Sequence, residues 1–280
     1  MANTISSIPT LDLNDGTSVP IVGYGTGTAW FKASGDTGIN HELIESIKTA
    51  TKLGYHHLDG AEVYQTEEEL GQAIKESGVS REKLIVTTKV ITNVADIPQA
   101  INTSLKKLQF DYVDLYLIHA PYFAKTKKEL QAAWAAMEQV KASGKARSIG
   151  VSNFLQSDLE TILETAKVVP SVNQIEFHPY LQHGNLVPYQ ESKGIKTVNP
   201  LLSSLATKYA VSQTEILLRW IIDRGCVAIT TSGKESRLSS YLRTFTFKLT
   251  PQEIDEISKV GEQKHYRAFW REKLADDDRS

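Results

Sequence analysis

Short runs of apolar and β-branched residues alternate with longer amphipathic stretches along almost the whole chain. Eight such runs have the length of strands; they cover residues 21–25, 55–59, 84–89, 112–119, 146–151, 172–176, 196–198 and 227–231. Between them, apolar residues recur at helical spacing, as in Leu43, Ile44, Ile47 and Ala50. The pattern predicts eight strands separated by helices.

Capping residues place two of these helices independently of the apolar spacing. Thr66 precedes Glu69, and Thr126 precedes Glu129, at the spacing of a capping box. Strands separated by helices pair in parallel, and a parallel sheet of eight strands closes on itself. The chain therefore predicts an α/β fold, a (β/α)8 TIM barrel, as a single domain over residues 1–280.

Two features near the N-terminus also bear on the fold. Residues 10–13 and 18–20 flank the turn Asn-Asp-Gly-Thr, whose residues tolerate positive φ, so an N-terminal β-hairpin is expected. The glycine-rich run from Gly23 to Gly27 suits the dinucleotide loop of a doubly wound open sheet, which is the competing fold. No helical pattern follows this run, where Trp30, Gly35 and Gly38 stand instead, so the barrel is preferred.

Composition and charge narrow the class of protein. The 280 residues are 41% hydrophobic, which excludes a disordered chain, and 31 basic against 33 acidic side chains give a formal charge of -2. Such a chain has no overall positive field to attract nucleic acid or an anionic membrane. The single cysteine, Cys226, forms no internal disulfide, and neither a secretion signal nor a membrane-length apolar run is present. We expect a cytoplasmic monomer with a small-molecule partner.

Polar side chains stand where most of the predicted strands end. Asp59, Lys89 and His119 end the second, third and fourth strands, and a further set lies at or after later strands: Ser152, Asn153, Gln174 and Ser232. In a barrel the carboxyl ends of the strands meet at one rim, where the chemistry takes place. Each side chain alone also suits an ordinary role, such as a rim lysine or a turn-capping aspartate. Together with Tyr64, which follows Asp59 closely, they predict an active site.

Five motifs, in their order and spacing, resemble the aldo-keto reductases over nearly the whole chain, from Asp12 to about Trp270. They are Leu58-Asp59-Gly60-Ala61-Glu62-Val63-Tyr64, Thr88-Lys89, Asp111 to His119, Gly150-Val151-Ser152-Asn153-Phe154 and Val172 to Pro179. Within the family the chain looks most like the fungal NADPH-dependent reductases of α-keto amides and conjugated polyketones, through Gly25 to Trp30 and Tyr266 to Trp270. The resemblance implies NADPH-dependent reduction of ketones and aldehydes, α-keto or diketo compounds among them, to alcohols.

The resemblance also implies a catalytic tetrad of Asp59, Tyr64, Lys89 and His119. Hydride transfer to a carbonyl carbon leaves an alkoxide that needs a proton, and Tyr64 is the implied donor. A cation beside a phenol makes the hydroxyl a better acid, so Lys89, held by Asp59, is expected to activate Tyr64. His119, in its neutral form, is expected to donate a hydrogen bond to the carbonyl oxygen.

The family pattern implies that a larger set of residues binds NADPH: Gly25, Thr26, Asp59, Ser152, Asn153, Gln174, Ser232, Gly233, Lys234 and Arg237. Ser152, Asn153 and Gln174 match the positions that hold the nicotinamide carboxamide. In the phosphate segment Thr231 stands where the family commonly has lysine, so Lys234 and Arg237 are expected to bind the 2′-phosphate. A solvated helix start is the ordinary alternative for this segment.

The substrate pocket is expected to be an apolar funnel suited to a flat or bulky ketone, formed by Trp30, Tyr64, His119, Tyr122 and Phe123. The C-terminal aromatic residues Tyr266, Phe269 and Trp270 either close this pocket or cover the side of the barrel. No metal site is indicated.

Two other functions compete with carbonyl reduction. A lysine at a strand end, such as Lys89, also suits a Schiff-base aldolase, although that chemistry does not require Asp59 and Tyr64 beside it. The other alternative is a non-catalytic NADPH-binding protein. The intact tetrad argues against it, but it stays open because the segment after Val198 lacks the aromatic residue that stacks on nicotinamide in this family and the long loop over the pyrophosphate.

The short connection after the seventh strand has two explanations. Either the loop is short, or a segment of the molecule is missing from the chain at this point. We favour the second explanation, which predicts a break in the backbone at Val198–Asn199 or within two residues of it. A break would separate two consecutive Cα atoms by well over the usual distance of about 3.8 Å.

Overall fold

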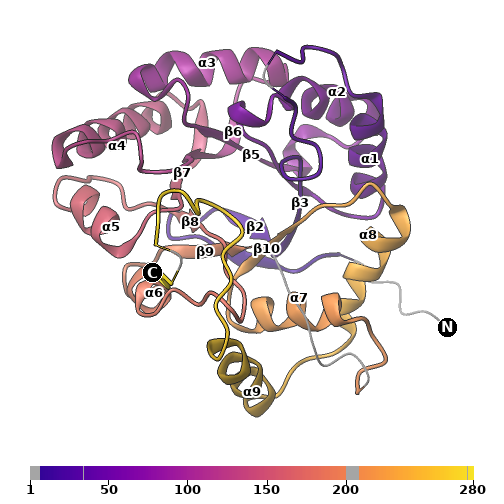
Figure 1. The fold of residues 1–280 in the computed structure, drawn as a ribbon. Helices are drawn as coiled ribbons and strands as arrows, with labels where there is room; N and C mark the ends of the chain where they lie inside the picture. Colours follow the sequence, from indigo (N-terminus) through magenta and orange to yellow (C-terminus); the bar gives the residue numbers. More distant parts are fainter. Residues whose placement is uncertain (1–6, 34, 200–207, 276) are drawn as a thin grey trace.

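The computed structural model describes residues 7–33, 35–199, 208–275 and 277–280. Eight parallel strands form a closed barrel in which each strand pairs with the next along the chain and the last pairs with the first (Figure 1). The strands are β3 (Val22–Gly25), β4 (His57–Asp59), β5 (Ile85–Val90), β6 (Val113–Ile118), β7 (Ala146–Ser152), β8 (Val172–Gln174), β9 (Lys196–Asn199) and β10 (Val227–Thr230). The predicted (β/α)8 barrel is confirmed, and the doubly wound alternative is wrong.

Helices cover the outside of the barrel because each presents an apolar stripe to the strands. In α1 (His41–Lys52), Leu43 and Ile47 are buried, and Asn40 caps the first turn by accepting a hydrogen bond from the Leu43 amide at 3.0 Å. The other α-helices are α2 (Glu67–Ser77), α3 (Ile97–Leu108), α4 (Lys127–Ala142), α5 (Gln156–Leu163), α6 (Leu186–Ser192), α7 (Gln213–Asp223), α8 (Glu235–Tyr241) and α9 (Pro251–Glu262). None of the helices in the described ranges is long and apolar enough to cross a membrane.

In the described parts of the chain, four short 3₁₀ turns lie in the connections: η1 (Glu62–Tyr64), η2 (Arg81–Lys83), η3 (Val94–Asp96) and η4 (Leu242–Thr246). Three of them follow or precede the strands that carry the expected active-site residues, and η1 itself ends at Tyr64. The turn closes with Gln65 at φ 58, in the left-handed region, so the chain reverses directly after the tyrosine.

The two predicted capping boxes have different outcomes. At α4, Thr126 accepts from the Glu129 amide at 3.3 Å and Glu129 accepts from the Thr126 amide at 3.2 Å, so this box is confirmed. Helix α2 begins where the sequence predicts, but the expected box with Thr66 does not form. Thr66 donates instead to the Thr26 hydroxyl at 3.0 Å, which ties α2 to the loop after β3.

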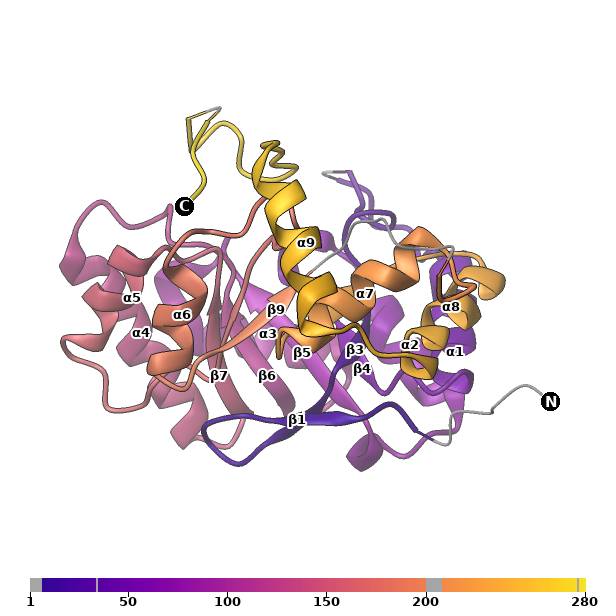
Figure 2. The ribbon, with the colours of Figure 1, turned by 90° about the horizontal axis from the view of Figure 1, so that it is seen from below.

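The predicted N-terminal hairpin is confirmed as β1 (Thr10–Asp12) and β2 (Ser18–Pro20), which pair antiparallel. Leu13 and Val19 are buried against residues at the lower ends of the barrel strands, among them Leu115, Val172 and Val227. The Thr17 and Ser148 hydroxyls are 2.8 Å apart, which joins the turn to the start of β7. The hairpin therefore closes the amino end of the barrel (Figure 2).

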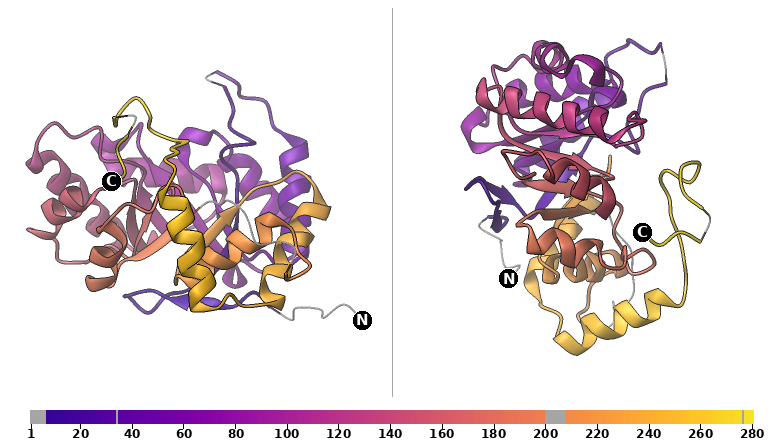
Figure 3. Two further views of the ribbon diagram at one scale, coloured as in Figure 1. Left: turned by 60° about the horizontal axis from the view of Figure 1, so that its bottom comes forward. Right: turned by 90° about the vertical axis from the view of Figure 1, so that its left-hand side faces the viewer.

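The C-terminal segment lies at the opposite end of the molecule from the hairpin. Helix α9 runs beside the barrel, and the residues after it cross toward the carboxyl ends of the strands (Figures 2 and 3). This leaves the hairpin at one end and the C-terminal segment at the mouth where the polar strand ends meet.

Strand β9 continues through Val198 and Asn199, which pair with Val227 and Ala228 of β10. The backbone break that we expected at Val198–Asn199 is therefore not found at that step. The rest of that expectation falls on residues 200–202, which lie outside the described residues. The next described helix, α7, begins at Gln213.

Cys226 lies directly before β10 and is buried. Burial raises the pKa of its thiol to about 12, so the reactive thiolate does not form at neutral pH. Cys226 is part of the apolar core.

Candidate active site

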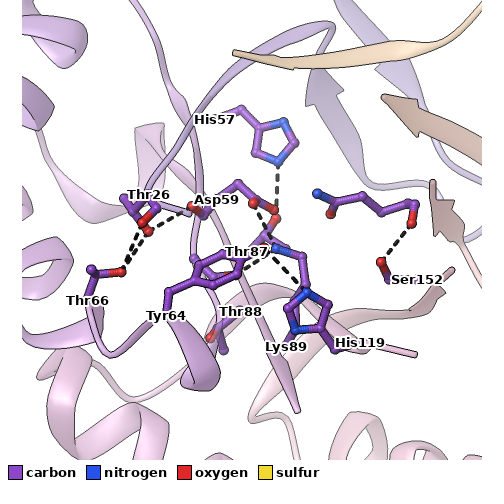
Figure 4. Close-up of polar contacts among 12 residues, drawn as sticks. Thr26, His57, Asp59, Tyr64, Thr66, Thr87, Thr88, Lys89, His119 and Ser152 are labelled. Carbon is purple, nitrogen blue, oxygen red and sulfur yellow. Dashed lines mark hydrogen bonds and ion pairs between the residues drawn. The ribbon is translucent and has the colours of Figure 1, made fainter. Parts of the chain in front are cut away.

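The carboxyl ends of β4 and β5 place a buried ion pair at the mouth of the barrel (Figure 4). Lys89 Nζ lies 2.7 Å from Asp59 Oδ1 and also donates to the Gly60 carbonyl oxygen at 2.8 Å. Both charged side chains are almost completely buried. Burial acts to lower the pKa of Lys89, but the charge of Asp59 and its hydrogen bond outweigh this effect and the pKa is raised. Lys89 is therefore a fixed cation.

The turn η1 brings Tyr64 over this ion pair. The centroid of its ring lies 5.1 Å from Lys89 Nζ, and its hydroxyl lies 3.4 Å from His119 Nε2. Gly27 permits this position, because a Cβ atom there would lie 2.9 Å from the Tyr64 ring. The structure thus brings together the four residues expected to form the tetrad: Asp59, Tyr64, Lys89 and His119 (Figure 4).

The protonation state of Tyr64 is set mainly by burial. Burial raises the pKa of Tyr64 above its ordinary value of 10.0, and the charge of Lys89 works in the opposite direction without cancelling it. Lys89 therefore acts in the expected direction, but the net shift is opposite to the one the sequence suggested. The phenol keeps its proton at neutral pH and is available as a donor.

His119 is neutral, in agreement with the expectation from the sequence. Burial lowers its pKa to about 3, and the charge of Lys89 adds to this effect. Its Nδ1 atom is buried without a hydrogen-bond partner among the described residues. A neutral ring with its proton on Nε2 presents that proton toward Tyr64 and the space in front of it.

Three polar side chains at the ends of β7 and β8 line the same cavity as the tetrad residues Asp59, Tyr64 and His119. The Ser152 hydroxyl donates to the Gln174 carbonyl oxygen at 2.7 Å, and Asn153 Nδ2 donates to the His119 carbonyl oxygen at 2.8 Å. Asn153 has φ 57, a left-handed conformation that asparagine tolerates. Amide side chains carry both donors and acceptors, so Asn153 and Gln174 have the groups needed to bind a carboxamide.

A cavity of about 740 Å³ lies between these two groups of polar residues. Asp59, Tyr64, His119, Ser152, Asn153 and Gln174 all line it. The rest of its wall is largely apolar and includes Phe31, Val63, Ile91, Phe269 and Trp270. Its volume falls in the range of small-molecule and cofactor sites, and the carboxyl ends of barrel strands are the usual place for them.

Some residues predicted to bind ligands support the cavity wall from behind. Trp30 is buried beside Gly233, where an added Cβ would lie 3.1 Å from the Trp30 ring, and Phe31 lines the cavity instead. Thr26 donates to the Asp59 carbonyl oxygen from its amide at 2.8 Å and from its hydroxyl at 3.1 Å. Gly25, in contrast, lies in the cavity wall.

The C-terminal aromatic residues lie at the cavity, as one of the two sequence interpretations proposed. Phe269 and Trp270 line it, and the Tyr122 ring packs at a tilt against Trp270 with ring centroids 5.0 Å apart. Phe123 packs against the core from a half-buried position, and Tyr266 is exposed.

The loop between β10 and α8 continues from the cavity to two exposed cations. Thr230 and Thr231 line the cavity, and Thr231 Oγ1 is buried without a partner among the described residues. Ser232 accepts from the Lys234 amide at 3.0 Å, which shapes the turn into α8. Within the described part of the chain neither Lys234 nor Arg237 forms an ion pair. An unpartnered hydroxyl beside two free cations suits a phosphorylated cofactor, so the residues present fit NADPH.

The sequence did not indicate several of the residues in the cavity wall, among them Phe31, Ile91, Tyr241 and Glu176. The position of Ile91 in the cavity wall depends on a long-range contact, because Glu62 accepts from the Ile91 amide at 2.6 Å and from the Asn93 amide at 3.1 Å. Glu62 and Glu176 both stand inside the family motifs, but spacing alone does not say which backbone amides they bind.

A closed parallel barrel with a fixed cation, a protonated phenol and a neutral imidazole around one cavity defines a class, the barrel oxidoreductases that reduce carbonyl groups. The sequence pattern of the aldo/keto reductase family matches residues 23–201 and 196–262. The chain belongs to the aldo/keto reductase family. The two matched segments meet at the end of β9, where the sequence lacks the long connection.

Named relatives share most of their length with the chain. It is 42% identical to the NAD/NADP-dependent indole-3-acetaldehyde reductase of Schizosaccharomyces pombe, over 91% of this chain and 96% of the relative. It is 38% identical to the NADPH-dependent alpha-keto amide reductase of Saccharomyces cerevisiae, over 92% and 93%. The structure of a Bombyx mori aldo-keto reductase in complex with NADP matches with a TM-score of 0.82 at 35% identity, over 91% and 93%.

These findings confirm the class of enzyme that the sequence predicted. The chain is an NADP-dependent oxidoreductase that reduces carbonyl groups to alcohols. Its likeness to fungal α-keto amide reductases is confirmed as well. Nothing in the site or among the relatives supports a Schiff-base aldolase or a non-catalytic NADPH-binding protein.

Proposed function

We propose that the chain reduces uncharged α-keto and diketo compounds and aldehydes, with Tyr64 as the proton donor. One observation carries the proposal. The Tyr64 hydroxyl and His119 Nε2 lie 3.4 Å apart at a cavity that Asn153 and Gln174 also line. A carbonyl oxygen that meets both groups leaves its carbon in the same cavity as the amide pair.

The residues of the chain have separate roles in this reaction. NADPH supplies the hydride when it is bound. Tyr64 gives its hydroxyl proton to the carbonyl oxygen as negative charge develops there, and His119 Nε2 donates a hydrogen bond to the same oxygen. Lys89 stabilises the phenolate that Tyr64 becomes, and Asp59 holds Lys89 in place.

Cofactor binding is divided between the two ends of the cavity. Ser152, Asn153 and Gln174 are proposed to bind the carboxamide and so select the face of the nicotinamide ring that meets the substrate. Lys234 and Arg237 are proposed to bind the 2′-phosphate, because both cations are exposed and free of ion pairs within the described residues.

The charge of the cavity supports uncharged substrates. No lysine or arginine is found among the described residues that line it, and residues 200–207 contain neither. The charge of Lys89 is already balanced by Asp59. A substrate carboxylate therefore loses hydration without gaining a partner. Two named relatives act on an α-keto amide and on an indole acetaldehyde, which are both uncharged carbonyl compounds.

We also propose that residues 1–280 form a single domain and that the protein is a monomer of the cytoplasm. One continuous apolar core joins residues from Val22 to Ile257, which supports a single domain. Size-exclusion chromatography with light scattering tests the monomer.

Steady-state oxidation of NADPH against a panel of carbonyl compounds tests the proposed function. The panel holds an aldehyde, an α-keto lactone, a diketone and an α-keto ester with the corresponding α-keto acid. We expect turnover of the uncharged compounds and a kcat/KM for the acid at least about tenfold below that of its ester. Equal use of acid and ester contradicts the proposed substrate class.

Tyr64→Phe tests the mechanism in the same assay. We expect kcat to fall by at least about a hundredfold, the usual scale for loss of a general acid, while NADPH binding measured by fluorescence titration is retained. Wild-type turnover by this variant would show that another group supplies the proton.

A further inference from the structure

We propose that Glu176 is a positioning residue that holds the C-terminal aromatic wall, Phe269 and Trp270, against the carbonyl cavity and thereby sets the preference for bulky substrates. The inference rests on the proposed function in one respect, namely that this cavity receives the carbonyl substrate. Glu176 itself lies in the cavity wall, just beyond the end of β8.

The Glu176 carboxylate gathers backbone amides from a distant part of the chain. Its Oε1 accepts from the Ala268 amide at 2.8 Å, and its Oε2 accepts from the Ala268 amide at 3.0 Å and the Phe269 amide at 3.0 Å. His178 Nε2 lies 3.0 Å from Oε1. The carboxylate is buried, so these bonds are shielded from water.

The segment that Glu176 holds has no helix or strand of its own to fix it. Helix α9 ends at Glu262, and the chain from there to the aromatic wall is irregular. Trp270 has φ 59, a strained left-handed conformation for a tryptophan, which persists only where neighbouring contacts enforce it. The amides bound by Glu176 immediately precede this residue, so the carboxylate supplies such a contact.

Glu176 does not serve the cavity as a free charge. Burial acts to raise its pKa, but the hydrogen bonds from His178 and from the Ala268 and Phe269 amides outweigh burial, so the pKa is lowered and the group is ionised. Its two oxygens already accept from these protein donors. It therefore acts on a substrate through the position of Phe269 and Trp270.

The place of Glu176 in the chain makes this contact specific to the active site. Gln174, two residues earlier, lines the same cavity as Tyr64 and is proposed to bind the nicotinamide. The barrel strand that presents the cofactor contact thus continues directly into the residue that holds the aromatic wall.

Glu176→Gln tests the proposal because it keeps the size of the side chain and removes its charge. The amide of glutamine presents an N–H₂ group to at least one backbone amide that the carboxylate accepted from. We expect KM for a bulky aromatic α-keto ester, ethyl benzoylformate, to rise about tenfold. KM for methylglyoxal, kcat for both and the Kd of NADPH should each change less than about twofold.

Glu138→Gln is the matched control. Glu138 also accepts from two backbone amides, those of Lys167 at 2.6 Å and Val168 at 2.9 Å, but it lies outside the cavity wall. This variant should leave the ratio of the two KM values unchanged. An equal rise in KM for both substrates in Glu176→Gln would show a general structural role and overturn the proposal.

Two further measurements separate this proposal from the proposed function. Phe269→Ala removes the wall itself, so the effects of Glu176→Gln and Phe269→Ala on the KM ratio should be non-additive; additive effects overturn the proposal. Hydrogen exchange at the Ala268 and Phe269 amides needs no turnover and should be faster in Glu176→Gln. Unchanged exchange overturns the proposal, whereas absence of carbonyl reduction in the wild type overturns the proposed function alone.

Ala268→Pro keeps the test decisive if Glu176→Gln does not fold. It removes the Ala268 N–H donor and leaves the carboxylate and the barrel unchanged. The same selective rise in KM for ethyl benzoylformate is expected, and an unchanged ratio overturns the proposal.

Discussion

Burial gives the ionisable side chains around the cavity protonation states that suit proton donation. Tyr64 and His119 are both held in their uncharged forms because the desolvation of each ring outweighs its other interactions. Lys89 keeps its charge because Asp59 contacts it directly. At neutral pH the site therefore contains one balanced cation, one phenol that holds a proton and one imidazole that can donate a hydrogen bond.

The pH dependence of carbonyl reduction follows from these shifts. The proposed mechanism needs Tyr64 protonated, and its raised pKa keeps it so until the pH exceeds the ordinary value of 10.0. It also needs His119 neutral, and a pKa of about 3 keeps the ring neutral throughout. We expect kcat/KM to be level between about pH 5 and 8 and to fall only on the alkaline side.

An inflection near the ordinary pKa of histidine, 6.5, would contradict the state assigned to His119. His119→Gln identifies its source. An inflection that disappears in this variant belongs to His119, whereas one that persists arises from another group.

The active site is assembled from strand ends and loops, which contribute in different ways. Asp59, Lys89 and Gln174 come from strands whose parallel pairing fixes their separation. The aromatic walls come from the loops after β3 and α9, and a few long-range side-chain contacts hold these loops. The tetrad is consequently the rigid part of the site, and the walls are the part that substitutions can change most readily.

The same division explains what the sequence could predict. The strand-end residues could be predicted because the spacing of apolar residues locates the strands, and strands that follow one another in a barrel end at the same rim. Which of two neighbouring aromatic residues faces the cavity depends on the path of the loop, so Phe31 lines it where Trp30 was expected. Thr66 shows the limit for helix caps, because a tertiary contact with Thr26 replaced a local bond of the expected spacing.

The cations at the start of α8 lead to a prediction about cofactor choice. Lys234 and Arg237 face no acidic partner among the described residues, and only NADPH carries a 2′-phosphate to neutralise them. In the double variant Lys234→Ala, Arg237→Ala we expect the Kd of NADPH to rise at least about tenfold and that of NADH less than about twofold.

Lys128→Ala is a suitable control for this experiment, because Lys128 is an exposed cation on α4 that lies outside the cavity wall. Fluorescence titration with both cofactors measures the effect. An equal rise in Kd for NADPH and NADH would show that these two residues do not bind the 2′-phosphate.

In the molecule as a whole, the hairpin that stabilises the fold and the cavity that binds ligands lie at opposite ends of the barrel. The hairpin packs its apolar residues onto the amino ends of the strands, and the ligand cavity lies at their carboxyl ends. Changes at the hairpin should therefore affect unfolding far more than catalysis.

Leu13→Ala tests this separation. Leu13 is buried in the apolar cluster under the barrel, so its truncation should lower the free energy of unfolding by about 2 to 4 kcal/mol. Leu11→Ala, at a partly buried position of the same hairpin, should lower the free energy of unfolding by less than Leu13→Ala. Urea denaturation measures both, and kcat of the folded Leu13→Ala enzyme should stay within about twofold of the parent. A large fall in kcat would show that the two ends of the barrel are coupled.

The burial of Cys226 has a practical consequence for attaching this enzyme to a surface. Because the only cysteine of the chain is enclosed beside β10 and resists ionisation, a thiol-directed reagent has no accessible target in the native protein. A cysteine introduced at Thr10, an exposed position on β1, becomes the single point of coupling. A maleimide support would then hold every molecule by its closed end. The open mouth would face the solution, so that both cofactor and substrate can enter and leave.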